Sequence, residues 1–238
     1  MNTNIARLKD IAILLGDINK DVVFVGGATV GIYIDDLAAP VPQPSEDIDC
    51  VVQIATYGEW CDFEAKLREK GFQDVDASGV DINPPTCRKF VIGMKVDFMP
   101  VVETVLGYGN PWFKSGLENS IKVSLGEIEI NIFKPEYFIA SKLKAFSDRG
   151  FNSDIRFSQD LEDITELIDG STKFEIEVIN SEENVNKFII QELNKILVNK
   201  DNFMEAMYGF LGYDDHKTRE ARVDRIFSII NKICQHPH

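Results

Sequence analysis

Helical and strand-like patterns of apolar residues alternate through the first part of the chain. Apolar residues recur at helical spacing over residues 3–16, and a short apolar run at 22–25 predicts a buried strand. Gly26-Gly27 ends this strand, and a helix is predicted from Ala28 to about residue 34. Three prolines then mark residues 36–46 as a loop, because proline lacks the backbone N–H and favours extended geometry before it.

Further strands and one helix are predicted up to Phe133. The predicted elements are a strand at 47–54, a helix at 58–70, strands at 87–92 and 95–102 joined at Gly93-Met94, and a hairpin of 121–125 with 127–133 about Gly126. This mixture predicts an α/β (α+β) core with a mixed β-sheet in residues 1–134.

Helical patterns dominate from Pro135 onwards. Proline suits the first position of a helix, and Ser158 is a typical N-cap for the next one. Later helices are expected at about 181–198, 201–210 and 216–234. Residues 135–238 are therefore predicted to form a helical C-terminal domain.

Charge and composition exclude several classes of protein. The net charge of −14 argues against a surface that attracts nucleic acid everywhere, although a local basic groove stays open. The four cysteines lack the paired spacing of a zinc site. No apolar run approaches the roughly 20 residues that span a bilayer. We expect a cytoplasmic protein without a membrane partner.

Two aspartates share one face of the strand at 47–54. Residues two apart in a strand point the same way, so Asp47 and Asp49 project together, opposite the apolar Ile48 and Cys50. Asp97 takes the same polar phase in a later strand. If the two strands are neighbours, three carboxylates meet in a site for Mg²⁺ or Mn²⁺, the hard cations that prefer oxygen ligands.

The Gly26-Gly27 turn offers a second half to such a site. Glycine permits close backbone approach, free N–H groups at a helix start attract phosphate, and Thr29 adds a hydroxyl. Each signal alone has a plain structural alternative, since Asp-x-Asp pairs often lie on solvated strand faces and Gly-Gly often forms only a turn. Their order along the chain is the stronger observation.

That order, from strand and Gly-Gly to the Asp-x-Asp strand and the later Asp97, resembles the DNA polymerase β-type nucleotidyltransferase superfamily. Several sequence segments are also similar to the AbiEii/AbiGii-type toxin nucleotidyltransferases. They lie around Gly26-Gly27 and at Ser45–Asp49, Pro135–Ala145 and Asp160–Ile164. This resemblance implies that Asp47, Asp49 and Asp97 bind metal and that Gly26, Gly27 and Thr29 contact the nucleotide. It also implies roles for Lys142, at the triphosphate, and for Asp160, which holds Lys142 or the acceptor. The alternative for these two is an ion pair between helices.

The resemblance implies transfer of a nucleoside monophosphate from an NTP to an acceptor hydroxyl, with Mg²⁺ or Mn²⁺ as cofactor. RNA such as a tRNA end, or a protein, is the acceptor expected of a toxin in a toxin–antitoxin or phage-defence system, with a cognate antitoxin as a possible partner. The acidic balance suits a small cationic acceptor of the aminoglycoside type instead. A non-catalytic nucleotide- or partner-binding protein with the same fold is the remaining alternative.

Overall fold

The computed structural model describes residues 3–76, 83–149 and 154–236. The chain forms two compact units, one of Met1–Thr29 with Gln43–Lys134 and the other of Val30–Pro42 with Pro135–His238. The units divide between Lys134 and Pro135, where the composition changes, and the segment Val30–Pro42 belongs with the C-terminal helices.

The first unit is built on a six-stranded sheet with the order β3-β4-β2-β1-β6-β5. Its strands are β1 Val22–Val25, β2 Asp47–Val52, β3 Arg88–Val91, β4 Met94–Pro100, β5 Ile121–Leu125 and β6 Ile128–Ile132. The pairs β1–β6 and β2–β4 are parallel, and the other neighbouring pairs are antiparallel. The predicted α/β class with a mixed sheet is therefore confirmed.

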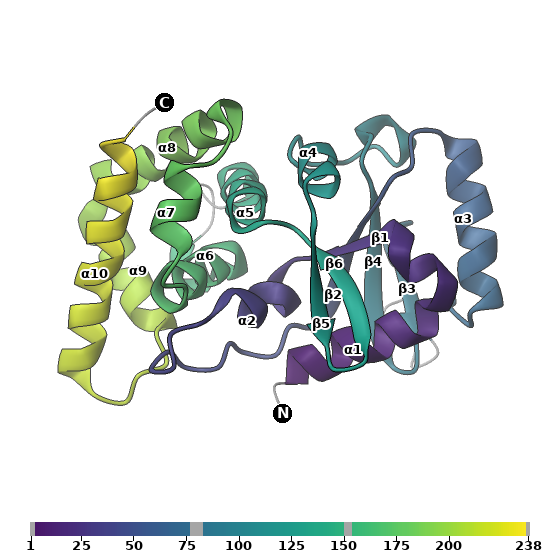
Figure 1. Cartoon of the computed structure of the whole chain (residues 1–238), viewed down its shortest axis with the longest axis horizontal. Coiled ribbons are helices and arrows are strands. Elements are labelled where there is room, and N and C mark those ends of the chain that lie inside the picture. Colours follow the sequence, from purple (N-terminus) through teal and green to yellow (C-terminus); the bar gives the residue numbers. More distant parts are fainter. Residues whose placement is uncertain (1–2, 77–82, 150–153, 237–238) are drawn as a thin grey trace. The chain divides into compact units, whose positions relative to one another are not determined.

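The helices of the first unit flank the sheet. They are α1 Thr3–Leu15, α3 Tyr57–Glu69 and α4 Phe113–Glu118, with 3₁₀ helices at Gly16–Asp21, Gly27–Thr29 and Glu103–Val105. Figure 1 shows α3 beside β3 and β4, and the Phe98 ring of β4 lies 5.4 Å from that of Phe63 in α3. Because side chains alternate along a strand, Asp97 projects away from this packed face.

The second unit is a helical bundle, as predicted for the C-terminal region (Figure 1). Its helices are α2 Val30–Tyr33, α5 Pro135–Arg149, α6 Gln159–Gly170, α7 Phe174–Ile179, α8 Glu183–Val198, α9 Lys200–Phe210 and α10 His216–Cys234, with a 3₁₀ helix at Ile155–Phe157. Ser158 caps α6 through the Leu161 N–H, as its position predicted. Over the described ranges, none of the helices combines the length and apolar character needed to span a membrane.

The segment after α2 is tied to the helical unit by charged contacts. Arg222 of α10 reaches Asp36 at 2.7 Å and the buried Asp169 of α6, also at 2.7 Å. The Gly170 carbonyl accepts hydrogen bonds from the N–H groups of Asp35 and Asp36. These contacts explain why a proline-containing loop without regular structure packs with helices distant in sequence.

Candidate active site

Strand register places Asp49 and Asp97 side by side in the sheet. In the β1–β2 pair Val25 lies opposite Asp49, and in the parallel β2–β4 pair Asp49 lies opposite Asp97. In the hairpin of β3 and β4, Arg88 lies opposite Asp97. Directly opposed residues share one face, so these side chains form a row across four strands. Asp47, two residues before Asp49, projects from the same face.

Arg88 binds Asp47 and Asp97. Its Nε donates to Asp97 Oδ1 at 2.8 Å, and its Nη2 donates to Asp97 Oδ2 at 2.7 Å, which is the two-pronged geometry that suits a guanidinium and a carboxylate. The same Nη2 donates to Asp47 Oδ2 at 2.9 Å. One nitrogen atom thus contacts both carboxylates, and the predicted convergence of Asp47 and Asp97 on one site is observed.

The backbone of Gly26 lies directly against the Asp49 carboxylate. An added Cβ at Gly26 would lie 2.0 Å from Asp49 Oδ2 and 2.8 Å from its Cγ, and the backbone has φ of 74°. A side chain at this position would therefore overlap the carboxylate in a conformation that glycine adopts most easily. The turn thus leaves room for the Asp49 carboxylate, a specific role that the sequence did not identify.

The segment after Gly26 differs from the predicted helix. Gly27–Thr29 is a three-residue 3₁₀ helix, and α2 adds only four residues, so a strong helix dipole aimed at phosphate is absent from this segment. Thr29 is fully buried, and its Oγ1 donates to the Gly26 carbonyl at 2.9 Å. The Thr29 hydroxyl thus stabilises the turn, which differs from the nucleotide contact that the sequence suggested.

The three aspartates provide only oxygen donors, which fits Mg²⁺ or Mn²⁺ and not zinc. Within the described residues, no three His, Cys, Asp or Glu side chains are already gathered as a metal-binding group. The Arg88 guanidinium accounts for this arrangement in part, because it occupies oxygens of Asp47 and Asp97. The donor chemistry fits a divalent ion, which would take the oxygens of Asp47 and Asp97 that the Arg88 guanidinium occupies.

Two uncharged groups border the aspartates. The pKa of the Cys87 thiol is raised to about 11, mainly by burial and to a smaller extent by the nearby Asp97 charge, whereas a hydrogen bond with Tyr108 lowers it. Burial, followed by the contact with Cys87, also raises the pKa of Tyr108. Both groups are therefore neutral near pH 7. Neither was identified from the sequence, because Tyr108 lies outside the predicted strands and Cys87 carries no charge that would mark it as a site residue.

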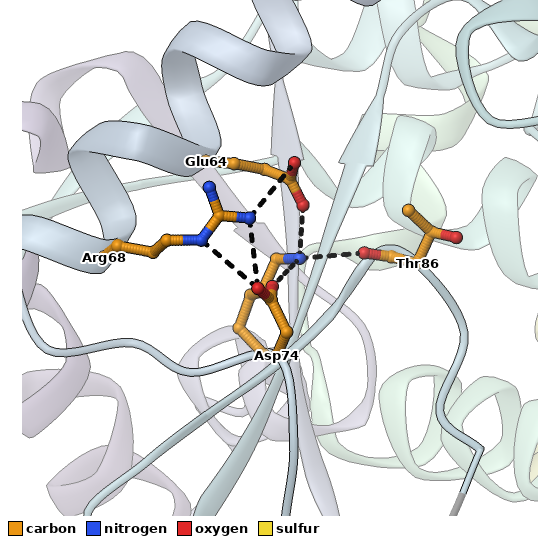
Figure 2. Close-up of polar contacts among 5 residues, drawn as sticks. Glu64, Arg68, Asp74 and Thr86 are labelled. Atoms are coloured by element: carbon orange, nitrogen blue, oxygen red, sulfur yellow. Dashed lines mark hydrogen bonds and ion pairs between the residues drawn. The ribbon is translucent and has the colours of Figure 1, made fainter.

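Lys89, adjacent to Arg88, belongs to a different cluster on the other face of β3. Its Nζ lies 2.6 Å from Glu64 Oε1 and 2.7 Å from Asp74 Oδ1, and it donates to the Thr86 carbonyl. Figure 2 shows these acids with Arg68, which also pairs with Asp74. The Lys89 side chain is 5% exposed, so this cluster anchors β3 to α3 and leaves Arg88 as the cation at the aspartates.

Lys142 and Asp160 lie in the second unit, where they form an ion cluster. Lys142 Nζ is 2.6 Å from Asp163 Oδ2 and 3.3 Å from Asp160 Oδ1, and Arg149 Nη2 is 2.6 Å from Asp160 Oδ2. The predicted pairing of Lys142 with Asp160 is present, and Asp163 joins it. Their roles toward a nucleotide or an acceptor stay predictions.

Four cations of the second unit are candidates for a basic stripe that would hold an RNA acceptor, namely Lys142, Lys144, Arg149 and Arg156. Like Lys142, each of the other three is paired in the structure: Lys144 with Asp148, Arg149 with Asp160, and Arg156 with Asp154. Acidic partners cancel much of the positive potential that a polyanion needs. This pairing weakens the case for RNA binding at the stripe.

Comparison with known proteins gives a structural likeness and no family. No family model matches the chain, and a search of curated proteins gave no match. Among solved structures, the chain is similar to an antigenic nucleotidyltransferase-like protein from Paracoccidioides brasiliensis, with 15% sequence identity and a TM-score of 0.46 over 82% of this chain and 90% of that chain. A TM-score below 0.5 does not establish function, which must therefore be argued from the residues of this chain.

Proposed function

We propose that the chain is a metal-dependent nucleotidyltransferase whose site contains Asp47, Asp49 and Asp97. The observation that carries this proposal is the strand register, which sets Asp49 opposite Asp97 with Asp47 on the same face. Three acids so close together favour a bound cation between them, because like charges repel.

Asp47, Asp49 and Asp97 would hold Mg²⁺ or Mn²⁺, and the lack of a side chain at Gly26 leaves room for the Asp49 carboxylate beside them. The ion would supply Lewis-acid stabilisation of charge on the triphosphate and on the attacking oxygen. The chain's own contribution is then to fix three oxygen donors on two rigid neighbouring strands, so that little reorganisation is needed during the reaction.

The proposed transfer step is an in-line displacement at the α-phosphorus of the NTP. The acceptor hydroxyl oxygen forms a bond to the α-phosphorus of the NTP, while the bond between that phosphorus and the bridging oxygen to the β-phosphorus breaks. Pyrophosphate leaves with the bonding electron pair. The hydroxyl proton passes to a carboxylate oxygen of this site, and we assign this role to Asp97, whose side chain is more enclosed than that of Asp47, at 13% against 30% exposed.

The acceptor carries a hydroxyl, and charge favours some classes over others. The net charge of −14 and the paired cations of the second unit disfavour RNA as the first choice. A small cationic molecule or a protein side chain fits this balance better. The resemblance to toxin nucleotidyltransferases supports RNA or protein, so the assay below includes each class.

A second candidate is a non-catalytic protein that binds a nucleotide or a partner. Arg88 favours this reading, because it already neutralises Asp47 and Asp97 without a metal ion. In such a protein Arg88 would be a permanent replacement for the ion. Metal-dependent turnover of an NTP separates the two candidates.

The test is a transfer assay with each α-³²P-labelled NTP, Mg²⁺ or Mn²⁺, and separate pools of RNA, protein and aminoglycosides. The wild-type protein should label one pool, and Asp49→Asn should lower labelling by at least about a hundredfold. Asp62→Asn is the matched control, because it removes the same charge from an exposed aspartate on α3, and it should retain activity. Absence of labelling and of pyrophosphate release in every pool would favour the non-catalytic candidate.

A further inference from the structure

Arg88 occupies the same carboxylate oxygens that a divalent ion requires. Both oxygens of Asp97 accept hydrogen bonds from its guanidinium, at 2.8 and 2.7 Å, and one oxygen of Asp47 accepts at 2.9 Å. The side chains are largely enclosed, with Arg88 17% and Asp97 13% exposed. The contact is therefore a fitted ion pair and not a transient surface pair.

A guanidinium and a divalent cation exclude one another at these oxygens. They carry like charge, and at about 4 Å in a partly buried site their repulsion amounts to several times the thermal energy. They also compete for the same lone pairs. Binding of an ion by Asp47 and Asp97 must therefore displace the Arg88 head group.

The neighbouring residue allows this movement without disturbing the sheet. Lys89 is anchored on the opposite face by Glu64, Asp74 and the Thr86 carbonyl (Figure 2), and the Phe90 and Gln73 backbones exchange hydrogen bonds. The β3 backbone is thus held on both sides of the strand. Rotation of the flexible Arg88 side chain is enough to release the carboxylates.

We infer that Arg88 is a built-in counter-ion that gates metal loading: it holds Asp47 and Asp97 together in the ion-free protein, and the ion displaces it. The displaced guanidinium stays next to the site and binds the triphosphate, whose phosphates are the nearest strong acceptors that an incoming nucleotide brings. Arg88 thus couples ion binding to nucleotide binding. This inference rests on the proposed function, because it requires that the aspartates bind a divalent ion.

Removal of the Arg88 guanidinium should change the Mn²⁺ affinity and the nucleotide affinity in opposite directions. Arg88→Gln should bind Mn²⁺ about tenfold more tightly than the wild type, because the competitor is gone. The same variant should bind a non-hydrolysable NTP analogue with Mg²⁺ about tenfold more weakly, because a triphosphate contact is gone. If Arg88 had a purely structural role, its loss would loosen the positions of the aspartates and weaken both the Mn²⁺ affinity and the nucleotide affinity.

The experiment measures free Mn²⁺ by electron paramagnetic resonance and nucleotide binding by calorimetry on the full chain. Arg68→Gln is the matched control, since it removes an arginine that contacts Asp74 from two nitrogens, at 3.2 and 3.0 Å, in the same unit, and it should change neither affinity. Arg88→Lys keeps the charge but loses the fork, so it should bind Mn²⁺ with intermediate affinity, and it serves if Arg88→Gln does not fold.

The outcomes separate this inference from the proposed function. Equal or weaker Mn²⁺ binding by the Arg88 variants, with binding by the wild type, overturns the gate and leaves the metal site standing. Mn²⁺ binding that is absent from wild type and variants alike, or unchanged by Asp49→Asn, overturns both. Tighter Mn²⁺ binding with unchanged nucleotide affinity retains the counter-ion but overturns the coupling to the triphosphate.

Discussion

Gly26→Ala tests whether the turn at Gly26 makes room for the Asp49 carboxylate. The added methyl would lie 2.0 Å from Asp49 Oδ2, far inside any normal contact, and the backbone keeps φ of 74°. Two costs therefore add. Gly93→Ala is a matched control, because Gly93 has nearly the same φ of 75° with nothing within 4 Å of an added Cβ.

The magnitude follows from the two costs taken separately. An alanine in the left-handed region loses about 1–2 kcal/mol, which both variants share. Overpacking against Asp49 adds about 1–3 kcal/mol to Gly26→Ala alone. The free energy of unfolding should thus fall by about 1–2 kcal/mol in Gly93→Ala and by about 2–5 kcal/mol in Gly26→Ala.

The assay is urea unfolding of a double-mutant cycle with Asp49→Ala. Truncation of Asp49 removes the two closest atoms and leaves its Cβ at 2.9 Å, so Gly26→Ala should cost about 1–2 kcal/mol less in that background. Equal destabilisation by Gly26→Ala and Gly93→Ala, or a coupling free energy near zero, would refute the close approach of Gly26 and Asp49.

Three further outcomes are expected. Ile92, a β-branched residue with φ of 44°, is strained, so Ile92→Asn should raise the free energy of unfolding by about 1 kcal/mol in urea titrations. Thiol reagents at pH 8 should modify the exposed Cys61 first, whereas Cys87, with its pKa raised to about 11 by burial, forms little thiolate and should react faster as the pH rises towards 11. Lys142→Ala should destabilise the protein by about 1–3 kcal/mol in thermal melts, because the enclosed Asp163 loses its partner; an unchanged melting temperature would show that this ion pair contributes nothing.

The last of these outcomes revises an expectation from the sequence. From the sequence, Lys142→Ala is expected to weaken nucleotide use without unfolding the protein, because a surface-pointing lysine contributes little to stability. The structure instead gives Lys142 a side chain 14% exposed between Asp160 and Asp163. Loss of nucleotide use in Lys142→Ala must therefore be compared with Lys142→Arg, which keeps the charge.

The common face of Asp47, Asp49 and Asp97 could be predicted from sequence because strand side chains alternate with a period of two residues. The neighbourhood of Asp97 could not, since it depends on the parallel pairing of β2 with β4, which are separated by α3 and β3. Parallel pairing leaves no turn signature in the sequence. The expected site depended on the parallel pairing of β2 with β4, and this pairing is present in the structure.

The predicted hairpin of β3 and β4 differs from the observed one in the position of its turn. A turn centred on Gly93-Met94 would set Asp97 opposite Phe90, whereas the observed turn at Ile92-Gly93 sets it opposite Arg88. An isoleucine with positive φ is unusual, so the true turn carried a poor signal. Similarly, a glycine turn before an apolar run suggested a helix from Ala28, but the run is a short 3₁₀ turn followed by α2.

The most direct test of the central claim is the metal-induced shift in melting temperature of wild type and Asp49→Asn. A ligand that binds only the folded state raises its stability, and removal of one carboxylate should weaken that binding. Mg²⁺ or Mn²⁺ should therefore raise the melting temperature of the wild type clearly more than that of Asp49→Asn. Equal shifts in the two proteins would show that Asp49 is not a ligand and would contradict the proposed metal site.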